Sequence, residues 1–257
     1  MESILKVDNL SKVFSRGGRQ PVTAVKNVSF ELMPGECLGV IGESGSGKTT
    51  MVNMITRLLD VTAGQIVLDG QDITNLRGKE LRNIYKKMQM VFQSPSDSFD
   101  PRRTLGDGIG ESLRNAGMSR REIRAEVKRL LEQCGLSKEF ADRYPHQVSG
   151  GQCQRAAIAR ALAIQPRLLI CDEATSALDV TVQKEIIDLL NQLRLAQGKH
   201  LSILFICHDL SLVQQFCDRV LVMYQGEIVE QGKPDDVIQK PEHAYTRRLI
   251  DSVLEFE

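Results

Sequence analysis

The chain has 257 residues, enough for one large or two small domains, and its 33 basic and 33 acidic side chains give a formal net charge of zero. A neutral balance predicts no bulk attraction to nucleic acid or to an anionic membrane surface. No apolar run approaches the roughly 20 residues that a membrane-spanning helix needs, and the N-terminus lacks the basic stretch and apolar core of a secretory signal. The six cysteines are scattered without a C-x-x-C pair, which indicates buried free thiols in a reducing cytosol rather than disulfides or a zinc site.

Two strands with alternating apolar residues are predicted near the N-terminus, over 4–10 and 25–32, with a polar, glycine-containing loop at 15–20 between them. A Pro-Gly pair signals the turn that ends the second strand. Phe14 precedes the polar loop, and an aromatic ring beside a phosphate site could stack on a nucleotide base. For Phe14 alone, a core or loop phenylalanine is the simpler interpretation.

A glycine-rich motif for phosphate binding follows the next strand. The apolar run 37–41 predicts a buried strand, residues 42–49 have the sequence G-E-S-G-S-G-K-T, and recurring apolar residues over 50–59 predict a helix. Backbone N–H groups in such a loop can converge on a triphosphate, because glycines leave the approach open and the helix N-terminus adds donors. The motif predicts that Lys48 reaches the β- and γ-phosphates and that the Thr49 hydroxyl holds Mg²⁺. The partial G-x-G inside it has no third glycine, so a dinucleotide site is disfavoured.

The composition changes after the next few elements. A hairpin arm is predicted over 64–70, a basic surface stretch over 81–87, and a buried strand over 88–92 that ends at Gln93. A loop rich in Ser and Pro follows. Helices are then predicted from their apolar spacing over 105–113 and 120–134, which indicates a helical subdomain inserted into an α/β core.

The α/β core resumes after this helical part. Apolar runs predict buried strands over 167–171 and 202–206, and an apolar stripe predicts a helix over 182–193 between them. A hairpin is expected over 220–231. The last residues, 233–257, are expected to form a short polar tail.

Polar side chains follow several of the predicted strands. Asp172 and Glu173 follow strand 167–171, at the edge where open α/β sheets bind their ligands. Beside a P-loop, Asp172 would contact Mg²⁺ through water, and Glu173 would orient or deprotonate an attacking water. His208 and Gln93 follow strands of their own, and each residue taken alone is more often structural than catalytic. Together with the P-loop, four strands end in groups suited to phosphate, metal or water.

A serine and two glycines open an alanine-rich helix in the helical part. Ser149 can cap this helix, and Gly150 and Gly151, followed by Gln152, leave backbone N–H groups open to an anion. One helix N-terminus stabilises a nearby charge by only about 0.3–1 kcal/mol. An ordinary capped helix is therefore a fair alternative when this motif is taken alone.

Together and in this order, the motifs resemble the ATP-binding cassette (ABC) ATPases. The resemblance covers essentially the whole chain and rests on the P-loop, Gln93, the signature 148–152, Asp172 with Glu173, the loop 176–179 and His208. It implies an α/β fold with a P-loop NTPase (RecA-like) core, an N-terminal antiparallel β subdomain and an inserted α-helical signature subdomain. We therefore expect 1–93 to be the first part of the ATP-binding core, 94–164 the helical signature subdomain, 165–232 the second part of the core, and 233–257 the tail.

The resemblance also implies the site and its ligands, ATP and Mg²⁺. Each ATP would lie between one chain's P-loop and the partner's signature in a head-to-tail dimer. Glu173 and His208 are the expected catalytic residues, His208 by contacting the γ-phosphate, and Thr49, Gln93 and Asp172 are the expected Mg²⁺ residues. The other expected nucleotide contacts are Phe14, against the adenine, with Gly42, Glu43, Ser44, Gly45, Ser46, Gly47, Lys48 and Thr50 in the same chain, and Ser149, Gly150, Gly151, Gln152 and Asp179 from the partner.

Within the ABC family, two stretches resemble the peptide/nickel importer group. Residues 91–102 look like its N-P-R segment, with Asp100 in place of asparagine, and residues 241–246 look like its H-P-Y-T element, with Ala244 in place of proline. The chain stops at Glu257, without the longer cysteine-bearing extension of larger peptide importers. We therefore expect the short nickel-type ATPases as the closest match and the dipeptide/oligopeptide type next.

This group implies an ATPase subunit that powers uptake of nickel, chelated or free, or of short peptides. It is expected to lie peripherally at the cytoplasmic face of the cell membrane, paired with a second and different ABC ATPase. The other expected partners are two integral-membrane permeases and an extracellular or periplasmic substrate-binding protein. No nucleic-acid partner is expected. The helical subdomain and the loop after Gln93 are expected to receive the coupling helices of the permeases.

Two other functions remain compatible with the P-loop. A non-transport ABC ATPase acting on DNA or ribosomes usually carries a long coiled-coil insertion or two fused cassettes, and neither is present in this sequence. A small-molecule kinase would use the same P-loop, but it would leave residues 149–152 unexplained.

Overall fold

The computed structural model describes residues 2–15, 20–176 and 178–254, so the loop predicted at 15–20 and Ala177 in the predicted loop 176–179 lie partly or wholly outside the described residues. The described strands form a six-stranded sheet of order β10-β9-β3-β8-β7-β6 and a four-stranded antiparallel sheet of order β2-β1-β4-β5. Their bounds are β1 Leu5–Phe14, β2 Val22–Leu32, β3 Cys37–Ile41, β4 Ala63–Leu68, β5 Gln71–Asp72, β6 Met88–Val91, β7 Leu168–Asp172, β8 Ser202–Ile206, β9 Arg219–Tyr224 and β10 Glu227–Gly232.

Parallel pairing at the centre of the six-stranded sheet aligns the carboxyl ends of its strands. Gly39 of β3 lies opposite Phe205 of β8 and Val220 of β9 in register, and Val91 of β6 lies opposite Cys171 of β7. Only β10 runs antiparallel to its neighbour in the described part of this sheet. The strands are short apolar runs because both faces of a parallel sheet are covered.

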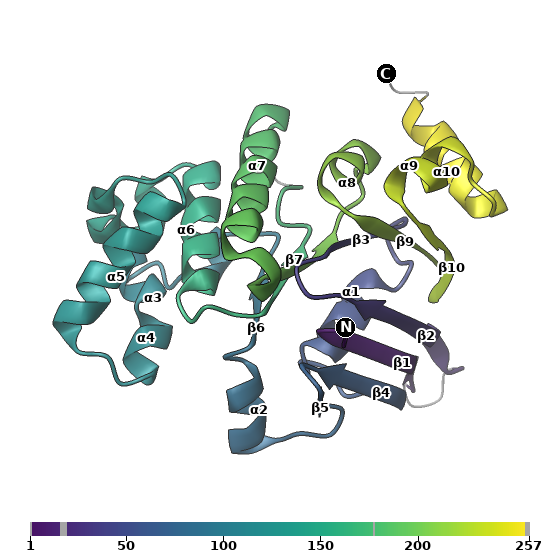
Figure 1. Cartoon of the computed structure of the whole chain (residues 1–257), viewed down its shortest axis with the longest axis horizontal. Coiled ribbons are helices and arrows are strands. Elements are labelled where there is room, and N and C mark those ends of the chain that lie inside the picture. The colour runs from purple at the N-terminus through teal and green to yellow at the C-terminus, as the bar shows by residue number, and fades with distance from the viewer. Residues whose placement is uncertain (1, 16–19, 177, 255–257) are drawn as a thin grey trace.

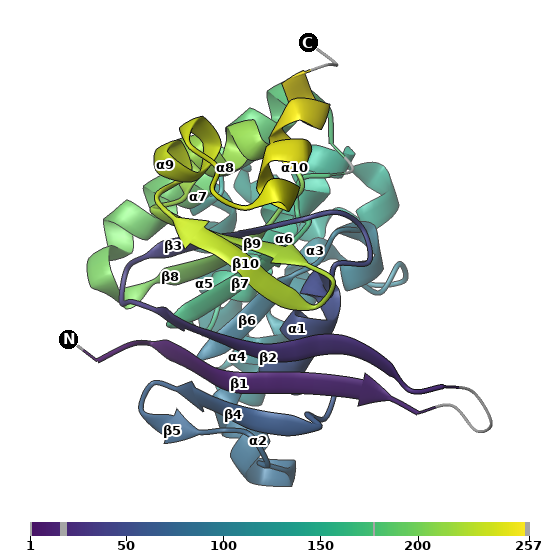
Figure 2. The ribbon, with the colours of Figure 1, turned by 90° about the vertical axis from the view of Figure 1, so that its right-hand side faces the viewer.

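Each face of this sheet packs into its own hydrophobic core. Side chains alternate along a strand, so Leu38 and Val40 of β3 join one core while Cys37 and Ile41 join the other. The first core also contains α1 and the inner face of the four-stranded sheet, and the second contains helices from the middle of the chain. Figures 1 and 2 show this arrangement, with the four-stranded sheet and the helical part on different sides of the central sheet.

Ten α-helices complete the described structure, and α3 to α6 form the helical part in Figure 1. None of the described helices combines the length and apolar character needed to cross a membrane. The helices are α1 Lys48–Ile55, α2 Gly78–Ile84, α3 Leu105–Ile109, α4 Glu111–Asn115, α5 Arg120–Gln133, α6 Gly150–Leu162, α7 Val180–Gln197, α8 Leu210–Phe216, α9 Pro234–Gln239 and α10 Ala244–Leu254.

The structure confirms the predicted fold class, the hairpins over 64–70 and 220–231, and the burial of all six cysteines as free thiols. The single helix predicted over 105–113 is wrong, because the chain bends at Gly110, which ends α3 and begins α4. A Cβ at Gly110 would lie 2.6 Å from Ile123 Cγ2, so the glycine lets this bend pack closely against α5. The basic stretch 81–87 begins within α2, where Ile84 is buried rather than at the surface.

The predicted polar tail is also wrong, because the chain after β10 folds into α9 and α10. Pro234 occupies the first turn of α9, where its missing N–H costs nothing. Val237 of α9 and Tyr245 and Ile250 of α10 are buried in the core that also contains the helices from the middle of the chain. The described part of the C-terminal segment, which includes α9 and α10, is therefore packed against the core.

We predict that Leu131→Ala in α5 lowers the free energy of unfolding by about 2–5 kcal/mol, because it leaves a cavity in a packed core. Leu131 is 0% exposed, whereas Leu195 of α7 is 68% exposed. The matched variant Leu195→Ala should change stability by less than about 0.5 kcal/mol. Urea unfolding followed by circular dichroism measures both, and equal losses in the two variants would contradict the assigned core.

Candidate active site

The loop between β3 and α1 encloses the ammonium group of Lys48. Lys48 Nζ donates to the carbonyl oxygens of Gly42 at 2.6 Å and Glu43 at 2.9 Å, and only 5% of the residue is exposed. Burial lowers the pKa of Lys48, while the carboxylates of Glu173 and Asp172 act in the opposite direction. The ammonium is therefore a desolvated positive charge facing two acids, and it can bind an anionic phosphate strongly.

Two glycines give this loop its shape. Gly42 has φ +148° and Gly47 has φ +106°, and a Cβ would lie 2.2 Å from Met223 O at the first and 2.6 Å from Ala24 O at the second. Glycine is required at both positions for backbone conformation and for space. No described side chain caps α1, so its first-turn N–H groups remain available to an anion at the helix N-terminus.

Asp172 at the end of β7 is the strongest candidate for a metal ligand. Burial, followed by the charge of Glu173, raises the pKa of Asp172 to about 6, and Lys48 acts against this rise. Its Oδ1 is buried without a hydrogen-bond partner, which is costly for a carboxylate. A carboxylate oxygen without a partner, with the Thr49 hydroxyl at the start of α1 and the Gln93 amide after β6, provides the hard oxygen donors that Mg²⁺ prefers. These residues therefore fit the ion.

Glu173 leaves the line of its strand through a left-handed backbone conformation. Its φ is +49°, which is uncommon outside glycine, and its N–H donates to Ile206 O at the end of β8 at 3.1 Å. The Ser176 hydroxyl in turn donates to the Glu173 carbonyl at 3.0 Å. These contacts hold the acid at the carboxyl edge of the sheet, and local backbone strain of this kind concentrates at functional sites.

Gln93 lies in the same hollow as Asp172. The two residues follow neighbouring parallel strands, β6 and β7, and they line a cavity of about 480 Å³ together with Phe92, Ser94, Ser98 and Arg160. The prediction from sequence missed Arg160. It lies on α6, donates to the Ser98 carbonyl and stacks over Phe99 at 5.1 Å, so it joins the helical part to the segment after Gln93. An arginine in an alanine-rich helix carries no sequence signal for such a role.

His208 is exposed directly after β8, and the next residue, Asp209, caps α8 through its side chain. Since β8 lies between β3 and β7, the sheet places the P-loop, His208, the Asp172–Glu173 pair and Gln93 in one row. The strand order therefore brings the four predicted strand ends to one edge of the sheet, as the sequence predicted. Phe14 lies at the end of β1 in the other sheet, where it is 39% exposed and the Lys12 ammonium lies 5.3 Å from its ring centroid.

The residues predicted to act from a partner chain occupy the N-termini of two neighbouring helices. Ser149 caps α6 in a capping box with Gln152, and Asp179 caps α7. A Cβ at Gly151 would lie 2.6 Å from Val182 Cγ1, so these helix ends are in close contact. Ser149, Gly151 and Gln152 line a cavity of about 420 Å³ to which no P-loop residue contributes. The structure therefore does not bring the signature and the P-loop of one chain into a common cavity.

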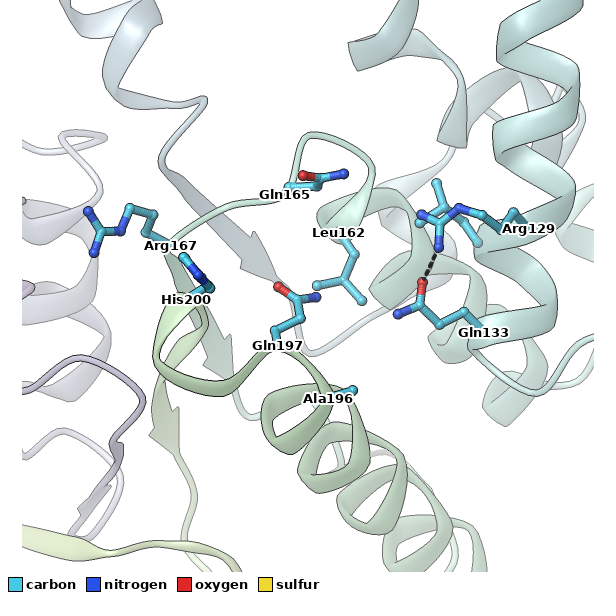
Figure 3. A pocket seen from close by; sticks show the side chains of 9 residues that line it. Arg129, Gln133, Leu162, Gln165, Arg167, Ala196, Gln197 and His200 are labelled. Carbon is cyan, nitrogen blue, oxygen red and sulfur yellow. Dashed lines mark hydrogen bonds between the residues drawn. The ribbon is translucent and has the colours of Figure 1, made fainter.

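Figure 3 shows another cavity, of about 400 Å³, which is lined by none of the strand-end residues described above. Arg167 and Leu162 line it beside the amino end of β7, whereas Asp172 is at the carboxyl end of the same strand. Arg129 in this cavity is already hydrogen-bonded to Gln133 at 3.0 Å and paired with Glu126. This hollow is smaller than the cavity that Gln93 and Asp172 line, and none of the predicted site residues lines it.

A glycine-rich loop before a helix, with a buried lysine and a pair of acids ending a parallel strand, defines the class of P-loop nucleoside triphosphatases. Comparison with known proteins narrows this class. The ABC transporter family matches residues 25–176, and the chain belongs to that family. The resemblance inferred from the motifs is confirmed, and the chain is an ATP-binding ATPase of the ABC type.

Three curated relatives illustrate the similarity. The oligopeptide transport ATP-binding protein OppF of Streptococcus mutans is 43% identical over 256 residues, which cover 99% of this chain and 82% of that protein. OppF of Escherichia coli is 46% identical over 232 residues, covering 90% and 69% respectively. The glutathione import ATP-binding protein GsiA of Pectobacterium atrosepticum is 45% identical over 260 residues, which cover 98% of this chain but 41% of that protein.

Solved structures agree with the fold. The dimeric post-hydrolysis structure of the ATP-binding cassette MJ0796 bound to ADP and Pi has a TM-score of 0.81 and 33% identity, and the match covers 90% of this chain and 98% of that one. The structure of cbiO1 from Clostridium perfringens, part of the ABC transporter complex cbiONQ, has a TM-score of 0.83 and 29% identity, with 94% and 93% covered.

We predict a pH-dependent effect of Asp172→Asn in the absence of metal and nucleotide. The folded-state pKa of about 6 exceeds the ordinary value of 3.8, so the stability contributed by the protonated carboxyl is complete below about pH 4 and is lost as the pH rises through 6. The side chain introduced by Asp172→Asn is neutral at every pH, so the variant does not lose this stability as the pH rises. Thermal melts in EDTA should therefore show the variant gaining a few degrees over wild type between pH 4.5 and pH 7.5.

Asp188→Asn, on the exposed face of α7, is the control for losing one negative charge. A melting difference for Asp172→Asn that stays constant from pH 4.5 to pH 7.5 would show that burial does not penalise the ionised carboxylate.

Proposed function

We propose that the chain is the ATP-hydrolysing subunit of an importer for short peptides, driven by ATP with Mg²⁺. The observation that carries this proposal is the row of strand-end groups in a chain that is 43–46% identical to two oligopeptide transport ATPases over at least 90% of its length. The names of these relatives support a peptide cargo. Uptake of nickel stays a prediction from sequence resemblance and is the second candidate.

Each group in the row has a chemical role in this proposal. Lys48 binds the β- and γ-phosphates, with the backbone N–H groups of residues 44–50 around them. Thr49 and Asp172 hold Mg²⁺ with Gln93 beside them, and the ion neutralises phosphate charge. Glu173 accepts a proton from the attacking water, and His208 contacts the γ-phosphate. Phe14 stacks on the adenine.

The signature residues act in trans in this proposal. Ser149 and Gly150 are exposed at the N-terminus of α6, and the cavity that Ser149 borders has no P-loop residue of the same chain in its lining. Ser149 and Gly150 therefore contact the γ-phosphate that is bound by a second ATPase. Asp179, at the neighbouring helix end, contacts the same nucleotide. The similar fold of the MJ0796 cassette, whose solved structure is dimeric, supports this arrangement.

The remaining partners follow from the importer class. We expect the second ATPase to be a different chain, and two integral-membrane permeases to receive the pair at the cytoplasmic face of the membrane. A substrate-binding protein outside that membrane would deliver the peptide. The helical part over 94–164 is the proposed docking region, because Arg160 links it to the segment that follows Gln93.

Reconstitution in proteoliposomes tests this function. The chain, its partner ATPase and the permeases are assembled with the binding protein, and ATP hydrolysis and uptake of a labelled tripeptide are measured. Hydrolysis should rise when the peptide-loaded binding protein is added, and uptake should require ATP. A rate that ignores the permeases would contradict the importer function. Uptake of Ni²⁺ in place of peptide would favour the second candidate.

We predict that Glu173→Gln lowers ATP turnover by about 10²–10⁴-fold while MgATP still binds, because the amide cannot accept the water's proton. Single-turnover hydrolysis and equilibrium binding of a fluorescent ATP analogue separate the two effects. Glu132→Gln, an exposed acid in α5, is the matched control and should hydrolyse ATP at the wild-type rate. Undiminished turnover in Glu173→Gln would remove this residue from its proposed role.

We predict that Ser149→Arg blocks nucleotide-driven dimer closure and leaves MgATP binding to the separate chain intact, because the long cation fills the interface at the α6 N-terminus. Ser119→Arg is the matched control, since Ser119 caps α5 in the same kind of capping box. Light scattering with MgATP, in the hydrolysis-deficient Glu173→Gln background, measures closure. Normal closure with Ser149→Arg would contradict the shared site.

A further inference from the structure

A side chain of the C-terminal helix α10 is hydrogen-bonded to the phosphate-binding loop. Tyr245 is 1% exposed, and its hydroxyl oxygen accepts a hydrogen bond from the backbone N–H of Glu43 at 2.8 Å. The two residues are 202 positions apart in the chain. Burial raises the pKa of the Tyr245 phenol, so the hydroxyl stays neutral at physiological pH.

This hydrogen bond acts on the peptide group that also binds the lysine. The Gly42 carbonyl and the Glu43 N–H belong to one planar peptide unit. Lys48 Nζ donates to the carbonyl end of this unit at 2.6 Å, and Tyr245 accepts from its N–H end. The phenol, the peptide and the ammonium therefore form a chain of hydrogen bonds whose members polarise one another in a desolvated site.

The position of the phenol is itself fixed by contacts with β9. The ring of Tyr245 stacks on that of Tyr224 with centroids 4.1 Å apart, and Tyr224 ends β9. Met223, one residue earlier, has the carbonyl oxygen that would lie 2.2 Å from a Cβ at Gly42. The end of β9 and α10 thus close around the same peptide of the P-loop.

The entry into α10 is anchored to β10. The Glu230 carboxylate accepts hydrogen bonds from the backbone N–H groups of Glu242 at 2.9 Å and His243 at 3.0 Å, and His243 Nδ1 accepts one from Tyr245 N–H at 3.1 Å. Figure 2 shows α10 beside α9, next to the β9–β10 hairpin. Tyr245 is therefore held from its own backbone as well as through its ring.

We infer that Tyr245 is a positioning residue of the nucleotide site, and that α10 thereby sets the affinity of the P-loop for MgATP. The inference rests on the proposed function only in taking residues 42–49 as the phosphate loop. Losing the hydroxyl leaves the Glu43 N–H without its acceptor and frees the peptide that orients Lys48. One hydrogen bond of this kind corresponds to a roughly tenfold change in affinity.

Tyr245→Phe and Tyr224→Phe form a matched pair for the test. Both keep the stacked rings, but the Tyr224 hydroxyl accepts from Gln225 Nε2 at the surface, at 3.1 Å, rather than from the P-loop. The full-length chain is titrated with a fluorescent ATP analogue and Mg²⁺, and each variant is also melted. We expect Tyr245→Phe to bind about tenfold more weakly at a melting temperature close to that of Tyr224→Phe. Equal affinity in the two variants would overturn the inference.

If the melting temperature of Tyr245→Phe is too low for a binding titration, hydrogen exchange of the wild-type chain tests the inference instead. Coupling between two sites is reciprocal, so MgATP binding must slow exchange in α10 if α10 favours MgATP binding. Slower exchange over residues 244–254 with MgATP supports the inference, and unchanged exchange overturns it. Neither measurement involves permease or peptide, so a failure of transport in proteoliposomes would contradict the proposed function alone.

Discussion

The parallel register of β3, β8, β7 and β6 is the constraint on which the site depends. It places the P-loop, His208, the two acids and Gln93 along one edge of a sheet that is buried on both faces. Charges at this edge are desolvated by the packing beneath them, which lowers the pKa of Lys48 and raises that of Asp172. The fold thus assembles opposite charges at a cost that a phosphate and a divalent cation can relieve.

Local motifs made most of this arrangement predictable. The P-loop and the acid pair are short motifs, and each directly follows an apolar run that predicts a strand. Because the carboxyl ends of parallel strands meet at one edge of the sheet, the location of both motifs at that edge could be predicted. The cap of α6 was equally predictable, because Ser149 stands directly before a helical pattern. Membership in the ABC transporter family then follows from the order of the motifs, as the family match confirms.

Contacts between distant segments were not predictable in the same way. The hydrogen bond from Glu43 to Tyr245 joins residues 202 positions apart, and no local pattern in the sequence indicates which distant loop the C-terminal helix contacts. Arg160 is one of 33 basic residues, and only the structure shows that its guanidinium turns inward to Ser98. The bend at Gly110 depends on the space left by α5 rather than on propensity alone. Each of these features depends on tertiary packing between segments that are distant in the sequence.

The close approach of Gly151 to Val182 has a mechanical consequence. With a Cβ excluded by a distance of 2.6 Å, the tips of α6 and α7 have no room to slide past each other. The spacing of the two caps, Ser149 on α6 and Asp179 on α7, therefore depends on the absence of a side chain at position 151. A methyl group added there would force Val182 or the end of α6 to shift, although the substitution changes no charge.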